Sequence, residues 1–290
     1  MVEFNATDVV ASSAGHRVLL MESEGRVWVR SLAERSVSTP LETTFGKGGR
    51  RVALSDELDA VLAGAYYDHG LALYSCRTGR EIWRRKDIKK IQDVQLARDG
   101  ITAYCGRDGA SLLVLDLRTG ETTSAVPAAS AMYQSKFDPV HFLDGAVPQL
   151  VDNRDERVMV PRTTFAFLDV VFAPGRVCTS ESGGPVRCFD VRSGQELWRY
   201  QPAPEHHVLR LGYHESTSCV LGIERQYVSS DRSKQLVRLS LQDGSLVDSL
   251  DIGSTWSACF ALAGDVLVTT NGTVCSTTDG AVIPIEQIAD

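Results

Sequence analysis

The sequence predicts an all-β chain assembled from repeated four-stranded antiparallel units. Three segments share one pattern, an apolar run, a turn that ends in Thr-Gly or Ser-Gly, and a second run: 71–83, 112–121 and 186–198. Related patterns recur roughly every 40 residues, and no helical hydrophobic period fills the intervals. Repeats of this kind are typical of a β-propeller, so we expect one domain spanning residues 1–290.

The turns set the strand order in each repeat. In the second repeat, Asp56–Asp59 separates the first two strands, and Gly79 suits the last turn because glycine accepts a positive φ without steric cost. The same reading applies to the first, third, fifth, sixth and seventh repeats. The strands expected in the second repeat are 51–55, 60–65, 71–74 and 81–83.

The fourth repeat is the weakest. Pro148 and Pro161 oppose central strands, so they are expected at strand ends or sheet edges. The sequence predicts seven blades, and the alternative is six blades with an insertion near 125–165. The strands expected here are 132–137, 140–143, 147–151 and 157–160.

Two repeats carry a tryptophan after the Gly turn. Asp190, Ser193, Gly194 and Trp198 fit the pattern Asp-x-x-Thr-Gly-x-x-x-Trp, and the second repeat keeps its Thr, Gly and Trp83. The chain thereby resembles the WD40-like and quinoprotein-like β-propeller superfamily over essentially its whole length, although the Gly-His…Trp-Asp signature of WD repeats is absent. The resemblance implies that these tryptophans pack between neighbouring blades.

Composition narrows the class of protein. With 43% hydrophobic residues the chain can bury a large core, and its net charge of -7 argues against broad nucleic-acid binding. No stretch approaches the ~20 apolar residues of a membrane helix, and the first residues show no secretory pattern. Seven cysteines without a Cys-x-x-Cys pair indicate buried thiols in a reducing compartment, so we expect a cytoplasmic protein.

We expect no catalysis, no cofactor and no metal. The superfamily that the chain resembles includes pyrroloquinoline-quinone dehydrogenases. Such enzymes are longer and carry a vicinal disulfide, whereas this chain has no adjacent cysteines. The Gly-rich segment 46–51 lacks the spacing of a phosphate-binding loop. His206, His207 and His214 are expected at different faces and heights of a strand. The alternative is a small-molecule or metal-dependent hydrolase that uses the central channel.

The sharpest surface feature is a local basic segment. Residues 46–90 contain ten Lys/Arg and six Asp/Glu, a net +4, so the rest of the chain carries -11. Tyrosine and arginine are favoured at protein-binding hot spots, and a basic patch speeds the encounter with an acidic partner. We expect the basic residues in connections between blades and the aromatic ones in an adjacent loop. The predicted partner-binding residues are Arg50, Arg51, Tyr66, Tyr67, Asp68, His69, Arg84, Arg85, Lys89 and Lys90.

The sequence therefore predicts a non-catalytic protein-binding propeller. It would act as an interaction scaffold or as a neutralising, immunity-type partner of another protein, possibly an acidic one. We expect it to be monomeric by itself and to bind neither membranes nor nucleic acid.

Overall fold

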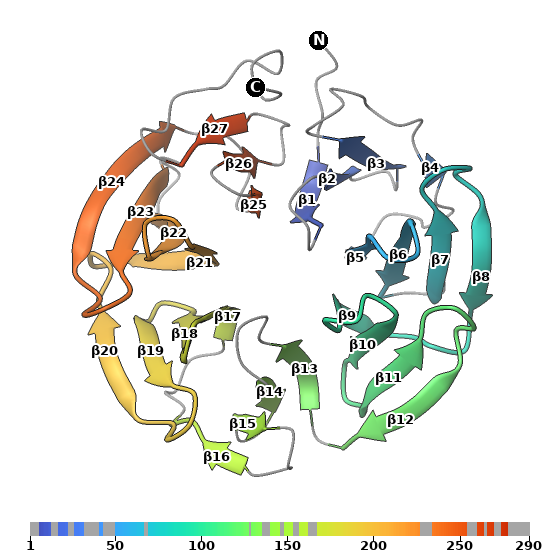
Figure 1. Ribbon diagram of the computed structural model, residues 1–290, viewed down its shortest axis with the longest axis horizontal. Helices are drawn as coiled ribbons and strands as arrows, with labels where there is room; N and C mark the ends of the chain where they lie inside the picture. Colours follow the sequence, from blue (N-terminus) through green and yellow to red (C-terminus); the bar gives the residue numbers. More distant parts are fainter. Residues whose placement is uncertain are drawn as a thin grey trace. The chain divides into compact units, whose positions relative to one another are not determined.

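The computed structural model consists of β-strands and turns (Figure 1) and divides into two compact units. The first unit comprises Met1–Met132, Val268–Val274 and Ile283–Asp290, and the second comprises Tyr133–Leu267 and Cys275–Val282. Among the described residues, no helix has the length and apolar character needed to cross a membrane. The structure describes residues 6–12, 17–22, 26–31, 41–42, 50–66, 69–127, 129–134, 140–145, 148–152, 157–161, 167–226, 234–253, 260–263, 266–269 and 274–277.

Three four-stranded sheets lie in the first unit, and within each the strands follow one another in chain order (Figure 1). We call the strands of each sheet A to D in that order. The sheets are β1 (Ala6–Ala11), β2 (Arg17–Glu22), β3 (Arg26–Ser31) and β4 (Leu41–Glu42); β5 (Arg50–Ser55), β6 (Ala60–Ala65), β7 (Leu71–Ser75) and β8 (Glu81–Arg85); and β9 (Ile91–Leu96), β10 (Thr102–Arg107), β11 (Leu112–Asp116) and β12 (Thr122–Val126).

The later part of the chain repeats this topology. Its four-stranded sheets are β13 (Ala129–Gln134), β14 (Val140–Gly145), β15 (Gln149–Asp152) and β16 (Arg157–Met159); β17 (Phe167–Ala173), β18 (Arg176–Glu181), β19 (Val186–Asp190) and β20 (Glu196–Tyr200); and β21 (His206–His214), β22 (Cys219–Gln226), β23 (Lys234–Ser240) and β24 (Leu246–Gly253). The last sheet, β25 (Phe260–Ala263), β26 (Val266–Thr269) and β27 (Val274–Ser276), has three strands in the described residues.

This architecture confirms the predicted class of four-stranded antiparallel blades. The described residues form six four-stranded sheets, and six is the number of blades in the alternative prediction. A seventh sheet has three strands in the described residues. The segment 125–165 contributes the sheet β13–β16, whose first strand begins at Ala129 rather than at Met132. Pro148 directly precedes β15 and Pro161 follows β16, so both prolines lie outside the strands as expected.

The turn between strands C and D is nearly identical in four blades. Its glycine N–H donates to the backbone carbonyl four residues earlier at 2.8–2.9 Å, and its φ lies between 67° and 73°. In each of the four turns the carboxylate or hydroxyl of the residue that supplies this carbonyl also accepts a backbone N–H of the turn; for example, Asp190 Oδ1 accepts from the Ser193 N–H, and Ser75 Oγ accepts from the Thr78 N–H. The four glycines are Gly79, Gly120, Gly194 and Gly244.

Both repeat tryptophans pack onto the turn of the next blade, as predicted. Trp83 Nε1 donates to the Leu117 carbonyl at 2.6 Å, and Trp198 Nε1 donates to the Leu241 carbonyl at 2.8 Å. Trp198 belongs to a buried cluster that includes side chains of both β18–β20 and β21–β23. The indole therefore contributes apolar burial and a hydrogen bond to the same junction between blades.

Candidate functional site

The predicted basic patch is centred on the connection between β8 and β9. Lys90 has a φ of 56°; its N–H donates to the Tyr66 carbonyl at 3.0 Å, and its carbonyl accepts from the Asp108 N–H at 2.9 Å. The half-buried Tyr66 donates its hydroxyl to Asp108 Oδ2 at 2.6 Å. These three bonds fix the end of the connection to the B–C loops of two successive blades.

The same connection exposes three cationic side chains. We define the lysine loop as residues 86–90, in which Lys86, Lys89 and Lys90 are exposed. Ile88 lies between them and is buried in the core of the first unit, where it packs in one cluster with residues of β6, β7, β9 and β10. The lysines are therefore presented on a backbone that is anchored in its middle and at its end.

The two arginines before the lysine loop were expected in a connection, but both lie in strand β8. The pairing of Arg85 with Leu71 extends this outer strand to its last basic residue. Arg84 donates to Glu81 at 2.6 Å, to the Tyr74 hydroxyl at 2.8 Å and to the His69 carbonyl at 3.2 Å. Its guanidinium therefore supports the blade as well as lying in the basic region.

Arg85 forms a similar local set of contacts. It binds Asp87 at 2.6 Å and donates to the Gly120 carbonyl at 2.7 Å. Its hydrogen bond is the main reason that the pKa of the Asp87 carboxyl lies below its ordinary value. Arg85 therefore links β8 to the next blade, and its charge is balanced within the molecule.

The remaining predicted residues divide between strand and loop. Arg50 was expected in a connection, but β5 begins at Arg50, one residue before the expected strand 51–55, and Arg50 pairs with Ala65. Arg51 is exposed and donates from Nε to the Gln92 carbonyl at 2.7 Å. His69 is half-buried, whereas Tyr67 and Asp68 lie outside the described residues.

Two residues of this region were not among the predicted site residues. Lys86 belongs to the same exposed loop as Lys89 and Lys90, and its place directly after Arg85 was the available signal. Asp108 is the second: it lies in the B–C turn of the third blade and accepts the Tyr66 hydroxyl. Tyr66 and Asp108 are 42 residues apart, which is about one repeat. The repeat alone does not say which side chains of the two loops meet.

The three histidines of β21 do not converge, as predicted. His206 begins the strand and its Nδ1 lies 3.3 Å from Glu224 Oε1, whereas His214 ends it. His214 is buried, with Nδ1 2.7 Å from Thr217 Oγ1 and Nε2 3.2 Å from Thr277 Oγ1. The described part of the chain contains no group of three potential metal-binding side chains.

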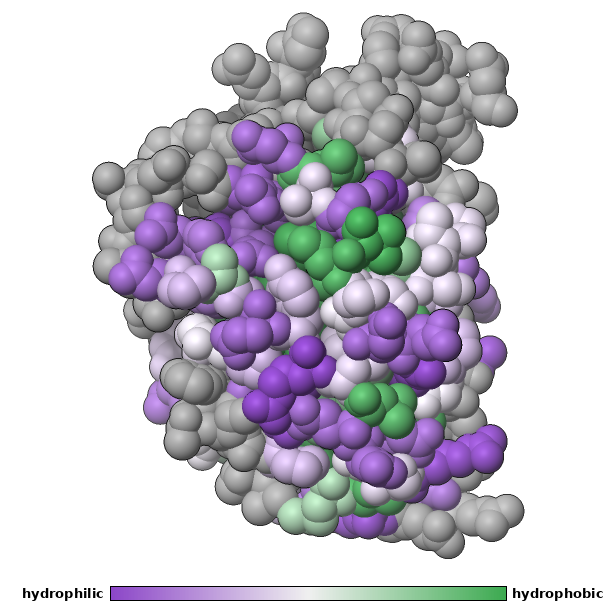
Figure 2. Space-filling model, turned by 90° about the vertical axis from the view of Figure 1, so that its left-hand side faces the viewer, coloured by the Kyte–Doolittle hydropathy of each residue, from purple (hydrophilic) through white to green (hydrophobic). Residues whose placement is uncertain are grey.

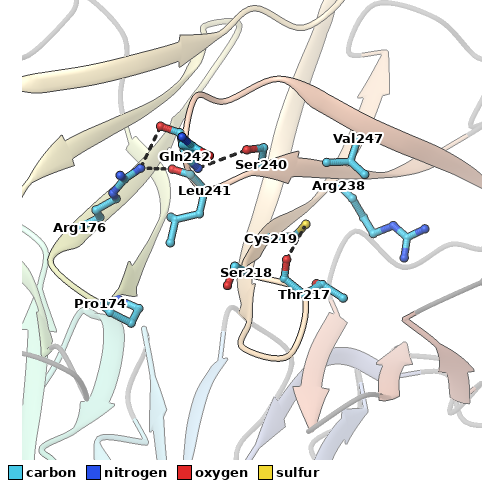
Figure 3. Close-up of a pocket in the computed structure, with 10 residues that line it drawn as sticks. All are labelled: Pro174, Arg176, Thr217, Ser218, Cys219, Arg238, Ser240, Leu241, Gln242 and Val247. Atoms are coloured by element: carbon cyan, nitrogen blue, oxygen red, sulfur yellow. Dashed lines mark hydrogen bonds between the residues drawn. The ribbon is translucent and has the colours of Figure 1, made fainter.

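A pocket of roughly 630 Å³ lies in the second unit, beside the A–B and C–D turns (Figure 3). Figure 3 shows Arg176 and Arg238 on opposite sides, with Thr217, Ser218 and Cys219 between them. No feature of the sequence indicated this pocket, because its residues come from turns of two different repeats. The lining residues are Pro174, Arg176, Thr217, Ser218, Cys219, Arg238, Ser240, Leu241, Gln242 and Val247.

The outer strands of the second unit carry isolated apolar side chains. Val247 and Leu246 of β24 are 56% and 48% exposed, and Leu197 of β20 is 43% exposed. Figure 2 shows this flank as a largely hydrophilic surface with separate apolar spots. Val247 also lines the pocket, so one of these side chains lies at its edge.

Comparison with known proteins identifies the fold. No family model matches the sequence, and no curated protein is significantly similar to it. The structure is similar to the β-propeller domain of Cps50 (Swd1) from Myceliophteria thermophila, with a TM-score of 0.76, 11% identity, and coverage of 97% of this chain and 96% of that chain. It is also similar to the computationally designed Ika8 protein, with a TM-score of 0.62, 14% identity, and coverage of 94% and 96%. At these identities the likeness concerns the fold, and the chain has the β-propeller fold.

Proposed function

We propose that this β-propeller is a non-catalytic protein-binding module and that the lysine loop contacts an acidic surface of its partner. One observation carries the proposal: three exposed lysines project from a loop that is held by the buried Ile88 and by the hydrogen bonds of Lys90. A loop ordered before binding loses less conformational entropy in a complex than a disordered one.

The charge distribution supports the same choice of partner. The chain as a whole carries a net charge of -7, whereas residues 46–90 carry a net +4. A local positive field on an acidic protein orients an incoming acidic partner and raises its association rate. Salt screens such interactions between exposed groups, so association through the lysine loop is expected to slow at high ionic strength.

The proposal includes two kinds of binding protein, an interaction scaffold and a neutralising partner. They differ in what happens to the captured protein: a scaffold leaves its activity intact, and a neutralising partner abolishes it. The proposed location is the cytoplasm, and its support is that the six described cysteines are free thiols. We further propose that the protein is monomeric before it binds.

The test compares two charge reversals of equal size. One variant changes Lys86, Lys89 and Lys90 to Glu, and the matched control changes Arg77, Arg80 and Arg98, which are exposed on turns at the opposite end of the strands. Each tagged protein is used for affinity capture from its native lysate at low and high salt. We expect a stoichiometric protein that the control retains and the lysine variant loses.

Equal capture by both variants would exclude the lysine loop as the contact while leaving a binding protein. Absence of any stoichiometric protein with the unchanged chain would contradict the binding function itself. The captured protein, once identified, is assayed with and without the propeller, which separates the scaffold from the neutralising partner.

A further inference from the structure

We propose that the pocket in the second unit binds a carboxylate carried on a short apolar body. This pocket uses residues of the second unit alone, and the proposal does not rest on the function proposed for the lysine loop. Its volume of roughly 630 Å³ lies within the range of small-molecule sites. The proposal depends on the charge balance of the lining, on its hydroxyl groups and on its apolar wall.

Arg176 supplies a positive charge that no carboxylate in the described part of the chain matches. Its Nη1 donates to the carbonyls of Leu241 and Gln242, the latter at 3.1 Å, as the dashed lines in Figure 3 show. Both acceptors are neutral, and within the described residues no carboxylate pairs with this guanidinium. No acceptor for its Nε and Nη2 lies among the described residues, and such a planar pair of donors matches the two oxygens of a carboxylate.

A second arginine at the same position in its blade shows the contrast. Arg17 begins strand B of the first blade, as Arg176 begins strand B of β17–β20. Arg17 meets two carboxylates, Asp56 at 2.7 Å and Asp59 at 2.5 Å, which lie in the A–B turn of the next blade. In the blade that follows Arg176, this turn is 215–218. Its one carboxylate, on Glu215, takes the place of Asp56 but does not line the pocket, and the residues of the turn that line the pocket are Thr217 and Ser218.

The other arginine of the pocket does not change this balance. Arg238 forms a bidentate ion pair with Asp248, and its Nη1 donates to the Thr277 carbonyl at 2.7 Å. Its charge is therefore neutralised, and its guanidinium forms one wall of the pocket. With the described residues counted, the lining carries one positive charge without a paired carboxylate, that of Arg176, and a monoanion would neutralise it.

The rest of the lining combines hydrogen-bonding groups with apolar surface. Thr217, Ser218 and Ser240 contribute hydroxyls, whereas Pro174, Leu241 and Val247 contribute apolar atoms. Such a lining suits a ligand whose carboxylate lies against Arg176 and whose hydrocarbon part lies against Val247. The carboxylate could belong to a free small acid or to an acidic side chain next to an apolar residue in a peptide, and both sources share the same chemistry.

The experiment measures binding of two acids, 4-methylpentanoate and phenylacetate, and of their neutral amides by ligand-observed NMR. A third arm uses a blocked Leu-Glu dipeptide and its Leu-Gln counterpart. We expect the acids or the Glu peptide to bind with a Kd on the order of 1 mM, as is usual for small ligands with one ionic contact. The neutral counterparts should bind at least about tenfold more weakly, the loss of one charge-assisted hydrogen bond.

Two variants locate the site. Val247→Glu places a carboxylate at the edge of the pocket on an exposed position, so it should abolish binding without unfolding the blade. Its control, Leu197→Glu, makes the same change on the exposed face of the neighbouring outer strand and should leave binding unchanged. Arg176→Gln should weaken binding at least about tenfold, whereas Arg192→Gln, an exposed arginine outside the lining, should not.

Each result decides for or against the proposal. If the acids alone bind, the source is a free carboxylate; if the Glu dipeptide alone binds, the source is a peptide. Equal binding of acid and amide, unchanged binding to Val247→Glu, or no binding of any anionic probe at concentrations on the order of 10 mM would overturn it.

Discussion

At the scale of single residues, the glycine of the C–D turn meets two demands at once. It adopts a positive φ, and it faces a side chain of the preceding blade: a Cβ on Gly244 would lie 2.5 Å from Trp198, and one on Gly120 would lie 2.9 Å from Trp83. In Gly79 the facing side chain is Leu41, at 3.7 Å. The backbone requirement is therefore constant, whereas the tightness of the contact varies with the residue opposite.

Gly244→Ala and Gly175→Ala separate these two demands. Both glycines have a φ near 70°, 73° and 68°, but a Cβ on Gly175 would meet no atom within 4 Å. We expect Gly175→Ala to lower the free energy of unfolding by about 1 kcal/mol, the left-handed backbone term alone. Gly244→Ala should lower it by about 2–4 kcal/mol, because Trp198 must also move. Urea denaturation of the two variants measures the difference, and equal losses would show that the tryptophan contact is not tight.

At the scale of elements, a buried arginine links three strands of one blade. Arg187 of β19 lies 3.4 Å from Glu181 of β18 and 2.5 Å from Glu196 of β20, and its guanidinium stacks 4.7 Å from the centre of the Phe189 ring. Arg187 also donates at 2.6 Å to the carbonyl of Pro161, a residue that follows the last strand of the preceding blade. Arg187 and Glu181 are both almost completely buried. The network therefore orders the blade while burying charge.

Removing the charge of Arg187 should lower the free energy of unfolding more than removing the charge of Glu181. Arg187→Met leaves Glu181 buried without its counter-charge, and we expect the free energy of unfolding to fall by about 3–5 kcal/mol. Glu181→Gln leaves Arg187 paired with Glu196, so the loss at neutral pH should stay within about 1 kcal/mol. Urea denaturation measures both variants, and equal losses would contradict this account.

The pH dependence has a definite sign. Burial raises the pKa of the Glu181 carboxyl, and this outweighs the opposing effect of Arg187. A raised pKa in the folded state means that folding favours the protonated form of Glu181. The contribution of Glu181 to the free energy of unfolding is therefore most favourable below the unfolded pKa and is lost as the pH rises through the folded pKa. The stability of Glu181→Gln relative to the unchanged protein should therefore improve between about pH 4 and pH 7.

At the scale of the whole molecule, the cysteines report on global opening. Cys105, Cys178 and Cys188 are fully buried in blades of both units. Burial raises the pKa of Cys105 to about 12 and holds the pKa of Cys178 well above its ordinary value, so little reactive thiolate forms. Buried thiols of this kind react only when the surrounding structure opens.

We expect these three cysteines to resist iodoacetamide near pH 7.5 in the native protein, with about one tenth or less labelled in the time that complete labelling takes in guanidinium chloride. Mass spectrometry of peptides after timed labelling gives the rate at each cysteine. Similar rates for all three would indicate one cooperative opening, whereas fast labelling of Cys178 and Cys188, which pair across adjacent strands of one blade, would indicate that this blade opens separately. Rapid labelling of all three in the native protein would contradict their burial.

Much of the fold could be predicted because its signals are local. The Thr-Gly and Ser-Gly turns lie between strands C and D, the tryptophans pack on the next blade, and the histidines of β21 do not converge. Boundaries were less accurate where no turn residue marks them. β8 continues to Arg85 and β5 begins at Arg50, because hydrogen-bond pairing with the adjacent strands determines where an outer or inner strand stops.

The sequence by itself determined the repeat and the antiparallel four-stranded blade, since strand alternation and turn chemistry act within a few residues. The role of the tryptophans was implied by the resemblance of the repeat to known propellers. The tertiary structure alone decided which charges are already paired. Arg17 meets Asp56 and Asp59 of the next blade, whereas among the described residues Arg176 meets neutral carbonyls beside a pocket. The physical reason is that a side chain's charge balance depends on residues that the fold brings together from different repeats, and linear spacing does not encode those contacts.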